Sequence, residues 1–295
     1  MQIHGAQLPD GERIMTFDRA RVGGRRLRPL QLALLVTLSS AATSIAADKP
    51  ATPTTVEDKP GWIVTLGAGT EYGPTFEGAG DNSFTFVPNF DIRRANEPAG
   101  LGAPDDSIDF SLIELGGVEF GPAANIRGSR SHSDVHGVHE IDWSVDAGAF
   151  AQYWLLENRL RVRAEARQGL QSDDGFVADF AVDWFQPLGD RFLLSAGPRA
   201  SFADATYMEN SFGVSPAEAL DNGSLSAFSP DAGFKSVGFV VGATYQINSK
   251  TSLLVYDKFD RLVGDAADSP IVTDIGSPNQ NTIGIVLSRS FHIGF

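Results

Sequence analysis

The last fifteen residues of the chain, NTIGIVLSRSFHIGF, alternate between two kinds of side chain. The odd positions from Ile283 to Phe295 are large and apolar except for Arg289, whereas the even positions are mostly small or polar. Successive side chains of an extended strand point to opposite faces, so this period of two predicts a strand with one apolar face. A fold for this chain must therefore place its last strand between an apolar environment and a polar one.

The same alternation recurs in eleven segments of residues 61–295. Most of them run for 9–14 residues, whereas a strand of a soluble protein averages about 5–6 residues. A strand that crosses a bilayer obliquely needs about 9–11 residues. The segments are 61–72, 83–93, 107–112, 118–127, 141–155, 159–170, 176–185, 191–202, 237–247, 251–262 and 281–295.

The connections between these segments alternate in length. LENR, PLGD and NSK are tight turns, whereas residues 128–139, 204–232 and 264–280 are long loops. Short turns at one end and long loops at the other are typical of outer-membrane β-barrels. Within the second long loop, SPAEAL predicts a short helix with Ser215 as its cap and Pro216 in its first turn.

The N-terminal region has the three-part pattern of a secretory signal peptide. Arginines at 21, 25, 26 and 28 precede an apolar run from about Leu30 to Ala42, and small residues follow at 44–46. We expect residues 1–46 to be a signal peptide, with the true start near Met15, and residues 47–60 to be a disordered leader. No later stretch is apolar over the roughly 18 residues that a transmembrane helix needs.

Together these features predict an all-β fold: a transmembrane, antiparallel, up-and-down β-barrel over residues 61–295, with both termini in the periplasm. Such a barrel needs an even number of strands. The eleven segments therefore indicate about twelve strands, with ten as the alternative, and the ambiguity lies in residues 94–117. A soluble β-sandwich also alternates, but the strand lengths, the final phenylalanine and the signal peptide favour the barrel.

Charge limits the partners of the mature chain. Residues 1–46 contain six arginines and three acidic residues, so the remainder has 17 basic and 34 acidic residues, a formal charge of −17. We expect no nucleic-acid partner, because phosphate binding needs a basic surface. With no cysteine in the chain, a disulfide framework and a thiolate metal site are excluded.

Charged residues on the inward faces predict the state of the lumen. Four arginines share one strand, and four aspartates lie on the predicted neighbouring strands, where opposite charges attract. A barrel of this size has a narrow lumen that side chains can fill. We expect a salt-bridged plug; the alternative is a selective small-solute channel whose arginines attract anions. The residues are Arg159, Arg161, Arg163 and Arg167, with Asp142, Asp146, Asp179 and Asp183.

Other motifs give no site that we would assign. The HSDVHGVH segment carries His132, His136 and His139, which are of a type that binds zinc or copper, but a polar surface loop explains them better. Turn chemistry likewise explains TFEGAGDNS and LVGDAADSP better than a phosphate or calcium loop. We therefore expect no catalytic residue, no cofactor-binding residue, no metal ligand and no cofactor, and a protein that is not an enzyme.

Several stretches resemble the MltA-interacting protein (MipA/OmpV) family of outer-membrane proteins. These are YGPTFEGAGDNSFTFVPNFDIR, FGPAANIRGSR, ADATYMENSFGVSPAEALDNG and LVGDAADSPIVTDIGSPNQ, and the last two are the most specific. The resemblance spans about residues 61–295. The chain departs from the family pattern in its last strand, at Arg289 and His292.

The resemblance implies an outer-membrane location, with outer-membrane lipid as a partner. For some members it implies a scaffold between a lytic murein transglycosylase and a peptidoglycan synthase. On this basis we expect a scaffold or interaction protein at the cell envelope, with a narrow channel or transporter as the alternative and an adhesin as the third. Arg289 raises a question of its own, because an arginine on the lipid face at mid-bilayer costs about 2–4 kcal/mol.

Overall fold

The computed structural model describes residues 61–97, 99–171 and 174–294. The predicted signal peptide and leader, as well as Phe295, lie outside these described residues. Period-two segments form strands in which apolar side chains alternate with small or charged ones, as expected for a sheet with two different faces.

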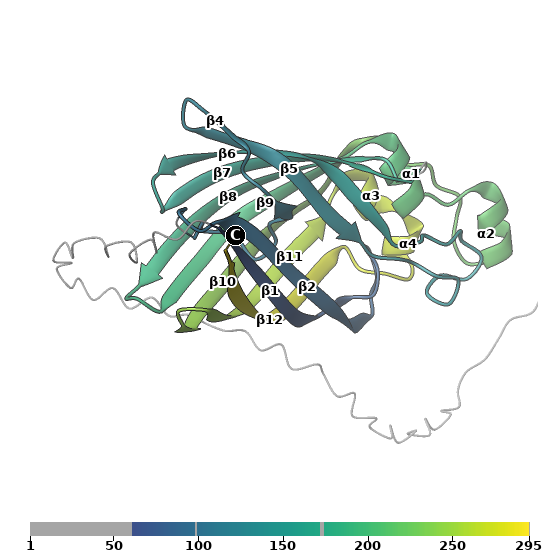
Figure 1. The fold of residues 1–295 in the computed structure, drawn as a ribbon. Helices are drawn as coiled ribbons and strands as arrows, with labels where there is room; N and C mark the ends of the chain where they lie inside the picture. The colour runs from purple at the N-terminus through teal and green to yellow at the C-terminus, as the bar shows by residue number, and fades with distance from the viewer. Residues whose placement is uncertain (1–60, 98, 172–173, 295) are drawn as a thin grey trace, which may run out of the picture. The chain divides into compact units, whose positions relative to one another are not determined.

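Ten strands are long and two are short within the described residues (Figure 1). The long strands have 10–16 residues, whereas β3 and β4 have two and three. The strands are β1 (Trp62–Pro74), β2 (Asn82–Arg94), β3 (Ile108–Asp109), β4 (Ile113–Leu115), β5 (Val118–Arg127), β6 (Ser144–Leu156), β7 (Leu160–Gly169), β8 (Phe176–Leu188), β9 (Phe192–Ala203), β10 (Gly233–Asn248), β11 (Thr251–Leu262) and β12 (Asn279–Ile293).

The strands form one antiparallel sheet that curls into a nearly closed barrel. Its order is β2-β1-β12-β11-β10-β9-β8-β7-β6-β5-β3, with β4 also paired to β5. Each strand from β5 to β12 pairs with the next along the chain, and β12 returns to pair with β1 from Trp62↔Ile293 to Tyr72↔Ile283. The predicted up-and-down barrel of twelve strands is confirmed.

The region that the sequence left ambiguous, 94–117, is where the barrel departs from regularity. Only Ile108–Asp109 and Ile113–Leu115 pair with β5, and the preceding residues 99–107 form no strand. Gly100, Gly102 and Pro104 explain this locally, because glycine and proline are poor strand residues. The irregular segment reaches the opposite wall of the barrel instead.

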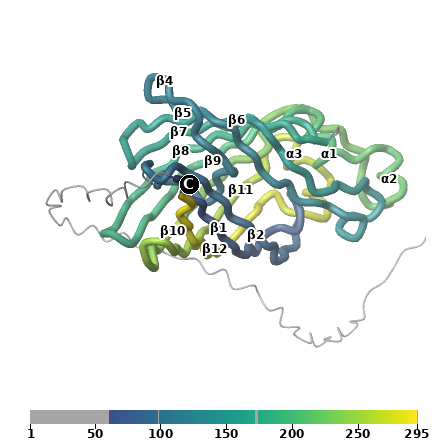
Figure 2. Tube along the Cα trace, in the orientation of Figure 1, coloured from purple at the N-terminus to yellow at the C-terminus, as the bar shows by residue number. Residues whose placement is uncertain are grey.

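The two ends of the barrel differ, as the connection lengths predict (Figure 2). At the short-turn end, β6–β7, β8–β9 and β10–β11 are joined by tight turns, and Gly116 and Gly117 turn β4 into β5 with positive φ of 60° and 83°. At the long-loop end, the connections are 75–81, 128–143, 170–175, 204–232 and 263–278. Both the first residue of β1 and the last of β12 lie at the short-turn end.

Four short helices belong to loops 204–232 and 263–278: α1 (Ala205–Phe212), α2 (Pro216–Asn222), α3 (Gly264–Asp268) and α4 (Pro270–Thr273). The predicted helix start is confirmed, because Ser215 caps α2 and exchanges bonds with Glu218 in a capping box. Among the described residues, none of the helices has the length and apolar character needed to cross a membrane.

The outer wall carries the apolar face of the strands. Phe180, Phe239, Phe259 and Ile285 are among many large apolar side chains that remain exposed there, which is the composition of a lipid-facing belt. Arg289 lies opposite Thr251, the first residue after the β10–β11 turn. Arg289 therefore lies near the short-turn end of the barrel rather than halfway along β12, where a charge would cost more.

Candidate functional site in the barrel lumen

The inner wall of β7 is a ladder of charged side chains. Arg161, Arg163, Glu165 and Arg167 occupy alternate positions and are all buried. Their alternation with Val162, Ala164 and Ala166 turns every charge inward. Charges buried in this way are stable only when they are paired and hydrogen-bonded.

Two of the predicted cross-strand pairs form. Arg161 Nη2 lies 2.7 Å from Asp183 Oδ2 on β8, and both side chains are almost fully buried. Arg167 likewise pairs with Asp179. Arg161 lies directly opposite Asp183, whereas Arg167 lies opposite Val177 and reaches Asp179 diagonally. These contacts are the interstrand attraction that the sequence predicts.

The other predicted members are arranged differently. Asp146 pairs with Arg127 of β5 at 2.9 Å, on the side of β6 away from β7. Asp142 precedes β6 and is exposed, while Arg159 belongs to the β6–β7 turn. The expectation was wrong for Asp142 and Arg159, because both lie beyond the strand ends. Asp146 lies within β6, but its partner on β7 is Gly169, so its carboxylate pairs with β5 instead.

The acidic partners that sequence reasoning missed come from the irregular segment 99–112, which we call the plug segment. Asp106 makes two bonds of 2.8 Å to the guanidinium of Arg161. Asp105 makes two bonds of 2.8 Å to Arg199 of β9, and Asp109 lies 2.6 Å from Arg163. In the sequence, these partners are indicated only by the adjacent aspartates 105 and 106, which lie where apolar and polar residues do not alternate.

The plug segment has its own local structure. The Asp106 carboxylate accepts a bond of 2.8 Å from the Ala103 amide, which is a side-chain-closed turn. Pro104, within that turn, meets Gly242 on β10: a β-carbon at Gly242 would lie 2.6 Å from Pro104 Cγ. The segment thus leaves the wall near β5 and reaches as far as β10.

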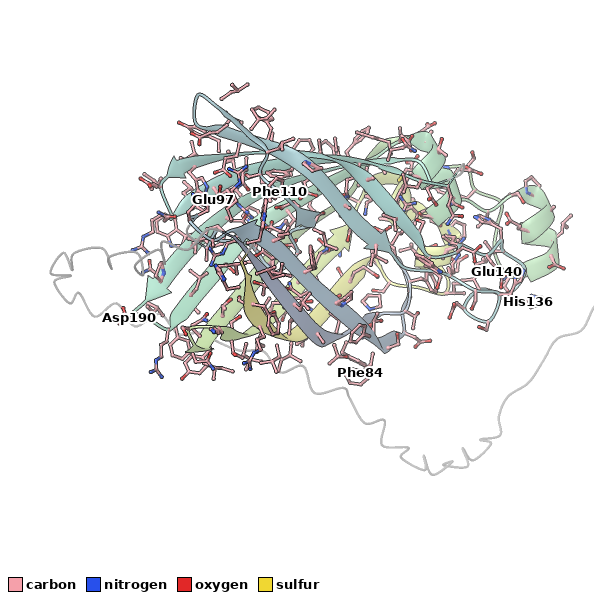
Figure 3. All side chains as sticks on the ribbon, viewed as in Figure 1. Phe84, Glu97, Phe110, His136, Glu140 and Asp190 are labelled. Carbon is pink, nitrogen blue, oxygen red and sulfur yellow. The ribbon has the colours of Figure 1, made fainter. Side chains whose placement is uncertain are left out.

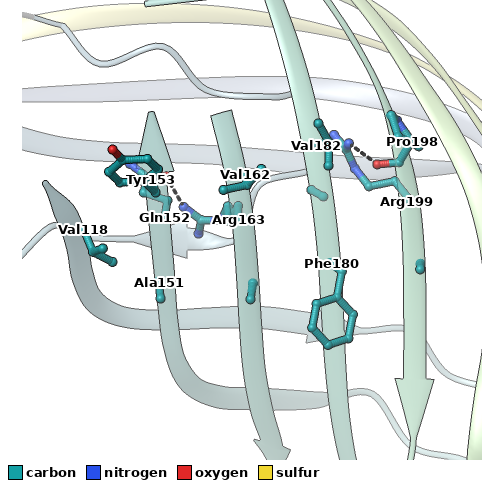
Figure 4. Close-up of a pocket in the computed structure, with 13 residues that line it drawn as sticks. Val118, Ala151, Gln152, Tyr153, Val162, Arg163, Phe180, Val182, Pro198 and Arg199 are labelled. Atoms are coloured by element: carbon teal, nitrogen blue, oxygen red, sulfur yellow. Dashed lines mark hydrogen bonds between the residues drawn. The ribbon is translucent and has the colours of Figure 1, made fainter. Parts of the chain in front are cut away.

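Further polar groups complete the lumen network. Glu165 bridges Arg163 and Arg167 and also accepts a bond of 2.6 Å from Ser107 of the plug segment. Gln152 on β6 accepts from Arg163 at 3.0 Å, as Figure 4 shows. Because every arginine of the network has at least one carboxylate partner, the network holds the plug segment to the wall at several points.

A cap covers the long-loop end of the barrel. Phe212, Met208, Val272 and Ala266 from the helices pack with Val177, Ala203 and Leu262 from strand ends into a buried apolar cluster. A second cluster joins Val135 and Val138 of loop 128–143 to Val214, Leu225 and Ile271. Residues from these two clusters therefore connect the long loops into one layer, at the right of Figure 1.

Buried polar contacts tie the cap to the remaining loops. Glu77 accepts a bond of 2.6 Å from Tyr207 and pairs with Lys235. Burial opposes ionisation of Glu77, but the charge of Lys235 outweighs it and lowers the pKa of that carboxyl. Arg130 donates to Ser211 O at 2.7 Å, near the end of α1, and its burial lowers its pKa to about 10.

The histidines of loop 128–143 do not form a metal site. His139 Nδ1 lies 2.7 Å from Glu218 Oε1 and its Nε2 lies 2.9 Å from Asn210 O, so this ring joins the loop to the cap. His132 and His136 are exposed, the latter at the tip labelled in Figure 3. Within the described part of the chain, no three histidine or carboxylate side chains are arranged to hold a metal ion.

The outer wall has an apolar depression. It has a volume of about 490 Å³ and extends from β5 to β9 (Figure 4). Outward residues such as Tyr153, Val162, Phe180 and Val182 surround it, with Pro198 in β9. Its position on the lipid-facing side makes it part of the apolar belt rather than of the lumen.

Comparisons with known proteins agree with this architecture. The MltA-interacting protein MipA family matches residues 66–291. No curated protein sequence matches the chain significantly.

Solved structures of similar fold include three barrels. An outer membrane channel from Pseudomonas putida F1 is 10% identical, with 83% of this chain and all of that chain covered and a TM-score of 0.42. The CymD monoaromatic hydrocarbon channel is 9% identical, with 80% and 90% covered and a TM-score of 0.39. The translocator domain of the autotransporter NalP from Neisseria meningitidis is 11% identical, with 80% and 90% covered and a TM-score of 0.36.

At these identities and TM-scores the three structures carry no functional argument. The family match covers most of the chain and all but the outer ends of β1 and β12 in the strand-forming region. The outer wall is an apolar belt of long strands. The chain therefore belongs to the MltA-interacting protein MipA family and is a β-barrel of the outer membrane.

Proposed function

We propose that this protein is a scaffold at the cell envelope, which brings a lytic murein transglycosylase together with a peptidoglycan synthase. It acts by presenting surfaces to partners rather than by conducting solutes. We further propose that both termini and the short-turn end face the periplasm, where murein enzymes are found. In this proposal the chain has no catalytic residue, metal ligand or cofactor.

One observation carries the proposal: the plug segment crosses the lumen from β5 to β10. The plug segment is paired to Arg161, Arg163 and Arg199, and the cap packs over the long-loop end. A conducting pore needs a continuous water path, which neither feature favours. A filled barrel serves better as a rigid platform, and the family's description as MltA-interacting fits that role.

Planar-bilayer recording of the purified protein tests whether the barrel conducts. We expect no large, steady openings from the wild-type protein. A variant that lacks residues 99–107 should show them, because it loses Asp105 and Asp106. Steady openings in the wild-type protein would contradict the proposal and support a channel.

Capture from crosslinked envelope extracts tests the partners. We expect a tagged full-length protein to recover a lytic transglycosylase and a peptidoglycan synthase. If neither enzyme is recovered and solute uptake depends on the protein, the scaffold proposal is overturned and a transport function is supported.

A further inference from the structure

The barrel is left open along part of one side of β2, because β3 lies beside only a short stretch of that strand and does not pair with it. The sheet ends at β2 on one side and at β3 on the other, and β2 pairs with β1 alone. Two outward phenylalanines of β2 reflect this: Phe84 and Phe86 are 76% and 69% exposed, whereas Phe180 and Phe239, on strands with two neighbours, are both 46% exposed. Phe90, farther along β2, is 41% exposed, so the opening is widest at the long-loop end. Strand edges without partners are not tolerated in hydrocarbon.

The register shows which backbone groups face the open side. Ala95 N–H bonds Gly61 O and Thr75 N–H bonds Asp81 O, both at 3.0 Å and both in the register of the β1–β2 ladder. In an antiparallel pair, alternate residues turn both backbone groups to the partner strand. Odd residues of β2 therefore face β1, and the even residues Phe84, Phe86, Pro88, Phe90 and Ile92 face away.

At the ends of the opening, backbone groups find hydrogen-bond partners in nearby residues. At the short-turn end, Glu97 supplies both partners for Arg94: its N–H bonds Arg94 O at 3.1 Å and its Oε2 accepts from Arg94 N at 3.4 Å. Across the opening, Leu112 N–H bonds Phe120 O at 2.9 Å and Asn125 Oδ1 accepts from Ile126 N at 2.9 Å. The edge of β5 is thus covered, and the open edge belongs to β2.

Between Phe84 and Ile92, no bond from the described residues reaches the even backbone groups of β2. We propose that this edge is a docking site for an extended segment of a partner protein, which adds to β2 as an antiparallel strand. The proposal rests on the proposed scaffold function, for which it supplies a contact surface. Main-chain bonds give such strand addition its affinity, and alternate side chains give it specificity.

A second copy of this chain does not fit the edge. Two copies in one membrane share an orientation, so their β2 strands run in the same direction and cannot pair antiparallel. The β5 edge of a second copy is covered by its own residues 108–115 and by Asn125. Among the described residues a copy therefore offers no antiparallel strand, which leaves a different polypeptide.

The side chains of β2 define the chemistry of the occupant. Residues that bond to the even positions must place their own side chains beside Phe84, Phe86 and Phe90, so these are apolar. The intervening residues face the lumen, where Asp91 is exposed and has no ion pair within the described region. Arg93 is engaged by the Glu97 carbonyl at 2.5 Å. The occupant is therefore an alternating apolar and polar segment with a basic residue opposite Asp91.

Hydrogen exchange of the full-length mature protein in lipid nanodiscs tests the edge directly. The probe is a nine-residue peptide of alternating valine and threonine with one threonine replaced by lysine. We expect it to slow exchange at Phe84, Phe86, Phe90 and Ile92 by at least about tenfold. The same peptide N-methylated on its valines should give no protection, and one N-methylated on its polar residues should still protect.

A variant pair controls for folding. Phe86→Pro removes one edge-facing N–H and should weaken binding of the peptide, whereas Phe86→Leu should leave binding unchanged. Pro88 shows that this edge accommodates proline. Three results would overturn the proposal. The two methylated peptides could protect equally, none of the peptides could protect, or these amides could already exchange slowly before peptide is added. Loss of murein-enzyme capture with peptide protection intact would instead overturn the scaffold function alone.

Discussion

Asp106 and Arg161 form a two-point ion pair inside the barrel, with Oδ2 2.8 Å from Nη1 and Oδ1 2.8 Å from Nη2. The two residues are joined across 55 positions of sequence and belong to a loop and a strand. Arg161 also bonds Asp183 on the neighbouring strand. This one guanidinium therefore holds the plug segment and the barrel wall together.

Replacing Asp106 by asparagine tests that connection. The change keeps the shape of the side chain but leaves Arg161 with one carboxylate, so we expect a loss of about 1–3 kcal/mol in the free energy of unfolding. Urea unfolding of the detergent-solubilised barrel, followed by gel mobility with and without boiling, measures it. Asp142→Asn is the control, because Asp142 is exposed outside the lumen network. Equal midpoints for the two variants would refute the structural role of the pair.

The contact between Pro104 and Gly242 yields a second prediction. Gly242→Leu puts side-chain atoms where Pro104 lies. We expect the overpacking to lower the free energy of unfolding by about 1–3 kcal/mol and to displace the plug segment. Cleavage of residues 99–112 by protease, and bilayer conductance, should both increase. Gly233→Leu is the matched control on the same strand, since a β-carbon there meets no atom within 4 Å. A plug segment equally protected in both variants would contradict the contact.

The strands were predictable because each one carries its own signal. β12 and β7 alternate over their whole lengths, and a lipid-facing belt demands that pattern from every strand. Residues 99–107 lack the pattern because both of their sides contact protein rather than lipid. Gly100, Gly102 and Pro104 disfavour a strand there, but nothing in the local sequence indicates that the loop turns inward.

The candidate site was predictable only where its residues are neighbours in the sheet. Arg161 and Asp183 share a register that follows from two consecutive strands joined by a connection of six residues. The partners Asp105, Asp106 and Arg199 come from distant segments, and no period in the sequence relates them. Likewise, the bond of His139 to Glu218 joins two loops, which turns a suspected metal ligand into a structural contact.

The pH dependence of the cap follows from Glu218. Burial raises its pKa, but bonds from Ser215 and His139 outweigh burial and lower it to about 2, from an ordinary value of 4.5. A carboxyl with a depressed folded pKa contributes stability that is complete above its unfolded value and is lost as pH falls toward the folded one. We therefore expect the cap to loosen between about pH 5 and 2.

Hydrogen exchange at α2 as a function of pH, corrected for the intrinsic rate, measures this loss. In Glu218→Gln the carboxylate is absent, so the cap should be looser at neutral pH and its stability should change less over the same interval. Asp221→Asn, on the same helix but outside the capping box, should behave like the wild-type protein. A wild-type cap whose protection stays constant down to pH 2 would exclude this role for Glu218.

The depth of Arg289 gives a prediction that separates the membrane boundary from its interior. Arg289 lies opposite Thr251 beside a turn, whereas Ile285 lies opposite Val255 farther along the same strand. Both side chains point outward, so only depth differs. We expect Ile285→Arg to destabilise the barrel by about 2–4 kcal/mol, because it puts a charge among lipid tails. Arg289→Leu should change stability by no more than about 0.5 kcal/mol. Reversible unfolding in lipid vesicles measures the free energy of unfolding of both variants. Similar losses of stability would contradict the position of Arg289 near the membrane surface.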